Sequence, residues 1–200
     1  MNKIHLKRLI SSMPESAIIC CDGAANRLKP WGIVPGYIIG DFDGATDDTI
    51  SYFRKLGVKF KKVVNQNKND LEKALDLAIA KKIFNVSVIG FAGGRLDHTF
   101  GNLSILSRYS RIVNITVYDG IFKGVFIRNK TVIRCRKNST VSLMPMPFAS
   151  GITTKGLKWK LKNEELSFSK REGALNLSVS DEILVDIKKG LLLVTYVPQL

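Results

Sequence analysis

The sequence of 200 residues is poor in cysteine and has no long apolar run. Its cysteines, Cys20, Cys21 and Cys135, lack the spacing of metal ligands, and we interpret Cys20 and Cys21 as buried thiols on opposite faces of a strand. Apolar stretches such as residues 190–194 fall far short of the roughly 20 residues that span a membrane. The basic N-terminal segment leads into no secretory apolar region. We therefore expect a cytoplasmic protein without a membrane partner.

Acidic residues are also scarce, since 17 aspartates and glutamates face 31 lysines and arginines and leave a net charge of +14. Such a charge suits nucleic acid or another polyanion. The sequence has neither an aromatic RNA-binding pattern nor a zinc-finger spacing. Lys158, Lys160 and Lys162 alternate with apolar residues, which indicates one solvated face of a strand. We favour a basic surface that attracts polyanionic substrates, and we do not expect nucleic acid as a partner.

Strand-like and helix-like segments alternate in the first half of the chain. Apolar runs predict strands at residues 17–21, 36–40, 58–64 and 85–90. Asn69 followed three residues later by Glu72 predicts the start of a helix, and the apolar residues after it repeat with helical spacing. This alternation predicts an α/β domain with a mainly parallel sheet.

Helical periodicity is lacking from about residue 121 onward. Short apolar segments predict strands at residues 124–128, 131–135, 140–146 and 156–161. Residues 182–197 predict a hairpin that turns around Lys188, Lys189 and Gly190. We therefore predict an α/β domain at residues 1–122 and an all-β domain at residues 123–200.

Aspartates collect where the predicted strands end, at Asp22, Asp41, Asp43, Asp70 and Asp97. Ligands of an open parallel sheet bind outside the carboxyl ends of its strands. In the segment GDFDG, Asp41 and Asp43 would share one side of an extended chain and repel each other. Asp70 and Asp97 are also compatible with acids that complement a helix dipole, and Asp22 and Asp43 with turn formers. Their recurrence favours a magnesium site.

A glycine-rich segment at residues 90–94 joins a predicted strand to a predicted helix. Such a turn lets backbone N–H groups approach a phosphate, and the guanidinium of Arg95 suits phosphate oxygens. His98 is compatible with an acid–base group and equally with a structural residue. The segment matches neither the P-loop nor GxGxxG, and no nucleophile triad is present. The residues alone therefore predict a magnesium-dependent enzyme that acts on a nucleotide or another polyphosphate.

Five blocks extend this interpretation: CDGAANRL (21–28), GDFDG (40–44), QNKNDLEKAL (66–75), GGRLDH (93–98) and GITTKGLKWKL (151–161). In this order they resemble the thiamine pyrophosphokinase family over nearly the whole chain. The resemblance implies a Rossmann-like α/β domain, a C-terminal β-sandwich, and a homodimer with the thiamine site across its interface. It also implies magnesium-dependent transfer of pyrophosphate from ATP to the thiamine hydroxyl, which gives thiamine diphosphate and AMP.

The same resemblance implies roles for individual residues. Magnesium would be held by Asp41, Asp43 and Asp70. Catalysis would involve Asp43, Asp70, Asp97 and Arg95, the last two beside the ATP phosphates. Further residues on the ATP side would be Asp22, Asn26, Arg27, Gln66, His98 and Asn102. On the thiamine side, Trp159 would stack on the pyrimidine and Asn176 would match a family asparagine.

Several positions depart from the family pattern. Gly44 replaces the usual serine, Asn67 replaces an acid that some members carry, and Asn69 replaces a threonine. Leu175, next to Asn176, lacks the polar character expected there. The chain also begins without the first strand of the family, so we expect either a shorter sheet or an incomplete N-terminus.

Two alternative functions follow from these departures and from the charge. A pyrophosphokinase for another hydroxymethyl heterocycle, such as a pterin, would account for the altered surroundings of Asn176. A non-catalytic nucleotide- or RNA-binding protein would account for the net charge, but it would have no need for several metal-side acids.

Overall fold

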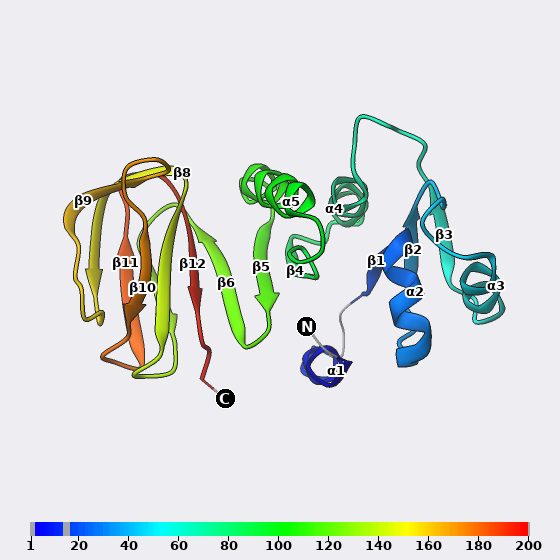
Figure 1. Cartoon of the computed structure of the whole chain (residues 1–200), viewed down its shortest axis with the longest axis horizontal. Coiled ribbons are helices and arrows are strands. Elements are labelled where there is room, and N and C mark those ends of the chain that lie inside the picture. The colour runs from blue at the N-terminus through cyan, green and yellow to red at the C-terminus, as the bar shows by residue number, and fades with distance from the viewer. Residues whose placement is uncertain (1–2, 14–16, 200) are drawn as a thin grey trace. The chain divides into compact units, whose positions relative to one another are not determined.

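The computed structural model describes residues 3–13 and 17–199. The chain divides into two compact units, with the division between Phe84 and Asn85. Figure 1 labels the helices and strands of both units.

The first unit is an α/β arrangement that follows the predicted alternation. Its strands β1 (Ile19–Cys21), β2 (Tyr37–Gly40) and β3 (Lys59–Lys62) pair in parallel in this order. Its helices are α1 (Lys3–Ser11), α2 (Asp22–Trp31), α3 (Asp47–Lys55) and α4 (Asp70–Ala80). Helices α2 and α4 pack on β1 and β2, and this packing buries Ile38, Ile39 and Leu75. The ends of β1 and β2 are therefore anchored in a small apolar core.

The second unit is mainly β. Strands β4 (Asn85–Ile89) and β5 (Asn114–Asp119) pair in parallel, and α5 (Leu96–Tyr109) connects them. The remaining strands are β6 (Phe122–Ile127), β7 (Thr131–Arg134), β8 (Thr140–Lys155), β9 (Lys162–Ser167), β10 (Gly173–Leu177), β11 (Glu182–Asp186) and β12 (Lys189–Tyr196). The hydrogen-bonded order is β4-β5-β6-β12-β8-β11-β7, and β9 and β10 also pair with β8. The long strand β8 is thus the centre of this unit.

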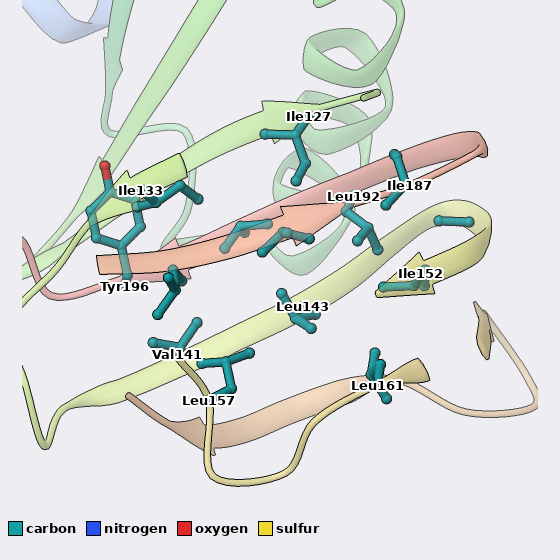
Figure 2. Packing of buried hydrophobic residues seen from close by; sticks show 14 of the residues in the cluster. Ile127, Ile133, Val141, Leu143, Ile152, Leu157, Leu161, Ile187, Leu192 and Tyr196 are labelled. Carbon is teal, nitrogen blue, oxygen red and sulfur yellow. The ribbon is translucent and has the colours of Figure 1, made fainter. Parts of the chain in front are cut away.

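Alternation along β8 builds the core of the second unit. Val141 and Leu143 are fully buried, and so are Ala149 and Ile152 beyond the irregular register in the middle of the strand. Figure 2 shows Val141, Leu143 and Ile152 in the same apolar cluster as Leu192 of β12. Burial of a Leu, Ile or Val side chain contributes about 1.5–3 kcal/mol. In the first part of β8 the buried residues therefore alternate with less buried ones, as in a strand with one face on the core.

The predicted fold class is confirmed in its coarse form, because an N-terminal α/β region with parallel strands precedes a mainly β region. Within the first unit β1, β2 and β3 pair in parallel, and within the second unit β4 pairs in parallel with β5. The Rossmann-like and sandwich descriptions, and the domain boundary between residues 122 and 123, stay predictions.

Two local predictions in the second unit are wrong. Strands β11 and β12 do not form a hairpin, because β8 lies between them and pairs with both, Val185 with Thr154 and Leu193 with Met144. Residues 156–161 form a loop with a single bridge, from Leu157 to Ser178, instead of a strand. Apolar alternation shows that a segment is half-buried, but it does not show which segment is its partner.

No helix in the described part of the chain is long and apolar enough to cross a membrane. This finding agrees with the absence of long apolar runs in the sequence.

Gly190 provides a test of the packing at the β8–β12 contact. Its φ is +97°, and a Cβ there would press on the carbonyl oxygen of Phe148 and lie 2.8 Å from the Cα of Ala149. We expect Gly190→Ala to lower the free energy of unfolding by about 3 kcal/mol or more, from the backbone conformation and the overlap together.

Gly120 is the matched control, because its φ is +57° and nothing lies within 4 Å of a Cβ built on it. Gly120→Ala should cost only about 1 kcal/mol. Chemical denaturation measures both values, and equal losses for the two variants would contradict the packing described at Gly190.

Candidate active site

Asp22 is the buried centre of an acidic cluster in the first unit. It follows β1 directly, begins α2, and is only 2% exposed. Its carboxylate accepts hydrogen bonds from the backbone N–H of Gly23 and, at 2.8 Å, from that of Phe42. Burial, followed by the negative charge of Asp70, raises the pKa of Asp22 despite these hydrogen bonds. The fold therefore holds a carboxylate where its charge is unfavourable without a cation.

Asp41 and Asp43 complete this cluster at the end of β2. One carboxylate oxygen from each of Asp22, Asp41 and Asp43 can be chosen so that all three lie within 4.8 Å of one another. Contact with Asp41 raises the pKa of Asp43. Burial opposes the charge of Asp41, but the hydrogen bond from Asp43, backbone hydrogen bonds and the charge of Lys73 together outweigh burial and lower the pKa of Asp41. When the pair takes up a proton, Asp43 therefore takes it in preference to Asp41.

The two aspartates face one side for a reason that differs from the prediction. The extended geometry expected across Asp41–Asp43 is wrong, because Phe42 has a left-handed φ of +71° and β2 ends at Gly40. The N–H of Phe42 bonds Asp22, and its ring contacts that of Phe60 with centroids 5.5 Å apart. A non-glycine residue in this conformation is strained, and such strain concentrates at functional sites.

Glycines and one asparagine give this turn its tight fit. A Cβ on Gly40 would lie 2.7 Å from the carboxyl carbon of Asp22, and one on Gly44 would lie 3.1 Å from Asp22 Oδ1. Asn26 donates from Nδ2 to the carbonyl of Gly44 at 2.8 Å and accepts from the N–H of Thr46 at 3.1 Å. Asn26 therefore ties α2 to the turn, and Gly44 leaves room for the Asp22 carboxylate.

Lys73 is a part of the site that the sequence did not predict. Its side chain on α4 is buried, and its Nζ lies 3.0 Å from Asp70 Oδ1. Burial opposes its charge, but Asp70 and then the charges of Asp41 and Asp22 outweigh burial and raise the pKa of Lys73. The available signal was its position three residues after Asp70, which places both side chains on one helix face.

Asp70 itself lies at the start of α4, where the prediction of a helix start is confirmed. The side chain of Asn69 accepts a hydrogen bond from the N–H of Glu72 at 3.0 Å and so caps the helix. Asp70 interacts electrostatically with Asp22, but it is ion-paired with Lys73 and does not belong to the compact carboxylate cluster. Arg27 and Gln66 are both exposed.

The last of the predicted site acids, Asp97, lies in the first turn of α5, after the glycine-rich loop of the second unit. Arg95 binds Asp97 through two hydrogen bonds of 3.1 Å and 2.6 Å, and this pairing lowers the pKa of Asp97 to about 2. Asn102 donates to the carbonyl of Phe91 at 2.8 Å and so holds the loop to α5. His98 is exposed. That Asp97 lies at the same strand ends as the acids of the first unit stays a prediction.

The two residues predicted on the thiamine side also lie in the second unit. Trp159 is 56% exposed in the loop that follows β8. Asn176 on β10 is buried and hydrogen-bonded to the backbone of Trp159. The fold therefore links these two residues, which are separated by 17 positions in the sequence.

The donor set of the acidic cluster suits a hard divalent cation. All its possible ligand atoms are carboxylate oxygens, and Asp43 is exposed while Asp22 is buried, so the cluster is reachable from solvent on one side. Magnesium prefers such oxygen ligands and keeps further positions for water or substrate phosphates. The cluster is thus chemically able to hold a cation together with a polyphosphate.

Comparison with known families divides the chain into two matched parts. Residues 8–118 match the model for the catalytic domain of thiamin pyrophosphokinase. Residues 130–192 match the model for the vitamin B1 binding domain of thiamin pyrophosphokinase. The first match alone covers more than half of the 200 residues.

Individual relatives agree with these matches. Thiamine pyrophosphokinase 1 of Oryza sativa subsp. japonica is 29% identical over 75% of this chain and 67% of its own length. Thiamine pyrophosphokinase 1 of Arabidopsis thaliana is 28% identical over 87% of this chain and 75% of its own length. The crystal structure of thiamine pyrophosphokinase from Bacillus subtilis aligns with a TM-score of 0.79, at 23% identity, over 91% of this chain and 87% of that one. The structural likeness shows a shared fold.

Lys73 provides a test of the electrostatic account of the cluster. Lys73→Met should lower the free energy of unfolding at pH 7, without divalent cations, by about 1–3 kcal/mol, because Asp70, Asp41 and Asp22 lose their buried counter-charge. The raised pKa means that this contribution is present below the ordinary lysine value of 10.5 and is lost as the pH rises past it. Urea denaturation at pH 7 and above pH 10.5 measures the difference.

Lys68→Met is the control, since Lys68 pairs with Asp76 at 2.6 Å while both side chains are about 40% exposed. That variant should lose less than about 1 kcal/mol. A loss for Lys73→Met no larger than the loss for Lys68→Met would contradict a buried counter-charge.

Proposed function

Because the chain belongs to the thiamin pyrophosphokinase family, we propose that it transfers pyrophosphate from ATP to the hydroxyl of thiamine and releases AMP. The family match over residues 8–118 carries this proposal, and the carboxylate cluster at Asp22, Asp41 and Asp43 supplies its chemical basis. Pyrophosphate transfer needs mainly positioning and neutralisation of phosphate charge. Both requirements match what the residues of the first unit offer.

Magnesium is the cofactor that fits these residues. Asp41 and Asp43 would hold it, with Asp22 as the buried third carboxylate and Asp70 as a further acid on the metal side. Bound magnesium would neutralise charge on the ATP phosphates and on the leaving AMP. The buried ammonium of Lys73 supplies a positive charge next to Asp70. Asn26 fixes the turn that carries Asp43. The protein thus positions its acids before the cation arrives.

The second unit offers groups for the substrates. The exposed guanidinium of Arg95 and the N-terminal turn of α5 suit ATP phosphates, with His98 and Asn102 in the same helix. The exposed indole of Trp159 suits a flat heterocycle such as the thiamine pyrimidine. We propose a homodimer in the cytoplasm as the working form, in line with the family resemblance.

Product analysis tests this function directly. Purified protein with ATP, Mg²⁺ and thiamine should give thiamine diphosphate and AMP in equal amounts, measured by chromatography. Formation of ADP, or no product while a known family member works in parallel, would contradict it. Pterin alcohols offered in competition should give no product, and tight salt-sensitive RNA binding without ATP turnover would favour a binding protein instead.

The Asp43→Asn variant assigns the reaction to the cluster. It should lower turnover by at least about a hundredfold, because the cation site loses a charged ligand, while the fold stays intact. Asp76→Asn is the matched control, since Asp76 lies in α4, pairs with Lys68 and does not belong to the carboxylate cluster. Its turnover should stay within about twofold of the parent, and Mg²⁺ should raise Tm for this control more than for Asp43→Asn.

A further inference from the structure

The loop between β8 and β9 presents a tryptophan to solvent on a built support. Leu157 and Leu161 on either side of Trp159 are 0% and 5% exposed, and both insert into the core of the second unit (Figure 2). Leu161 closes the loop on β8, because Thr154 N–H donates to its carbonyl at 3.0 Å and its own N–H donates to Thr154 Oγ1 at 2.9 Å. Both ends of the loop are thus fixed while the indole between them stays 56% exposed.

Asn176 fixes the middle of the same loop. Its Nδ2 donates to the carbonyl of Trp159 at 2.7 Å, and its Oδ1 accepts from the N–H of Trp159 at 3.1 Å. The same oxygen also accepts from the N–H of Leu177 at 2.8 Å, so both of its lone pairs are used. The neighbouring N–H of Lys158 donates to the carbonyl of Leu177 at 2.8 Å. A buried amide therefore takes the place of a strand partner for the backbone of Trp159.

The family resemblance implies that both Trp159 and Asn176 lie on the thiamine side, but their side chains make different contacts. The side-chain oxygen Oδ1 of Asn176 already accepts hydrogen bonds from two backbone N–H groups, and the residue is only 7% exposed. The indole of Trp159 is open to a ligand, and the Nζ of Lys158 lies 4.8 Å from its ring centroid. That ammonium disfavours a cationic ring beside the indole and favours a neutral heterocycle.

We propose that Asn176 is a positioning residue, which acts on the substrate only by holding the backbone of Trp159 so that the indole can stack on a neutral pyrimidine. This inference rests on the proposed function. A rigidly held aromatic ring binds a flat ligand without the entropy cost of ordering a mobile loop. Loss of the Asn176 amide therefore weakens binding of the heterocycle through Trp159 and leaves the binding of ATP unchanged.

A double-mutant cycle tests this coupling. Asn176→Ala and Trp159→Ala should each raise KM for thiamine about threefold to tenfold with KM for ATP unchanged, as expected for the loss of one stacking contact. In the Trp159→Ala background, Asn176→Ala should change KM for thiamine by less than about twofold. Effects that multiply would instead indicate a direct contact of Asn176 with substrate and would overturn the proposal.

Ser178→Ala is the matched structural control. Ser178 is fully buried two residues after Asn176, and its hydroxyl is hydrogen-bonded to Arg136, at 2.7 Å, and to Ser139 instead of to the backbone of Trp159. This variant should lose stability with no change in KM for thiamine. If Asn176→Ala does not fold, Asn176→Asp replaces it, since it keeps the volume and the acceptor but loses the Nδ2 donor. A rise in KM for Ser178→Ala equal to that of the Asn176 variant would count against positioning.

Fluorescence makes the test independent of catalysis. Trp31 and Trp159 are the two tryptophans of the sequence, so a Trp31→Phe protein reports Trp159 alone. Without substrate, Asn176→Ala should lower the anisotropy of Trp159 and increase its quenching by acrylamide, while Ser178→Ala should not. If the protein makes no thiamine diphosphate, the proposed function fails, and these fluorescence changes still support the positioning role. Unchanged anisotropy in Asn176→Ala would overturn that role in either case.

Discussion

Repulsion among carboxylates at the ends of β1 and β2 is the constraint on which the candidate site depends. Asp22, Asp41 and Asp43 gather with oxygens within 4.8 Å, and one of them is buried. Two unit charges about 4 Å apart repel by about 4 kcal/mol at an effective dielectric constant of about 20. The fold offsets this cost with backbone N–H donors to Asp22 and with the buried ammonium of Lys73. The remaining imbalance is what a divalent cation would satisfy.

Much of this arrangement could be predicted from the sequence. The aspartates after successive apolar runs indicated the acidic strand ends, and Asn69 with Glu72 indicated the start of α4. The left-handed backbone of Phe42 could not be predicted, because residue type disfavours it and only the hydrogen bond to Asp22 and the contact with Phe60 select it. Lys73 was missed because a lysine in a helix is normally solvated, and its burial depends on acids that are distant in sequence.

The second unit shows where local patterns stop being informative. The apolar residues of 140–146 predicted a strand, but the long strand β8 pairs with both β11 and β12, so their closeness in sequence wrongly suggested a hairpin. In the segment GLKWKL the alternating leucines suggested a strand, whereas Asn176 provides the hydrogen bonds that a strand partner would provide. That exchange turns an apolar alternation into a loop that exposes Trp159. The same contact underlies the positioning role proposed for Asn176.

The proposed cation site consists of the carboxylates that follow β1 and β2. Titration of the intact protein with Mn²⁺, followed by electron paramagnetic resonance, tests it most directly. The parent should bind Mn²⁺ at least tenfold more tightly than Asp41→Asn/Asp43→Asn. A matched Asp47→Asn/Asp48→Asn control removes the same charge from two exposed acids at the start of α3 and should keep the parental affinity. Equal affinities in the parent and in the Asp41/Asp43 variant would contradict the proposed cation site.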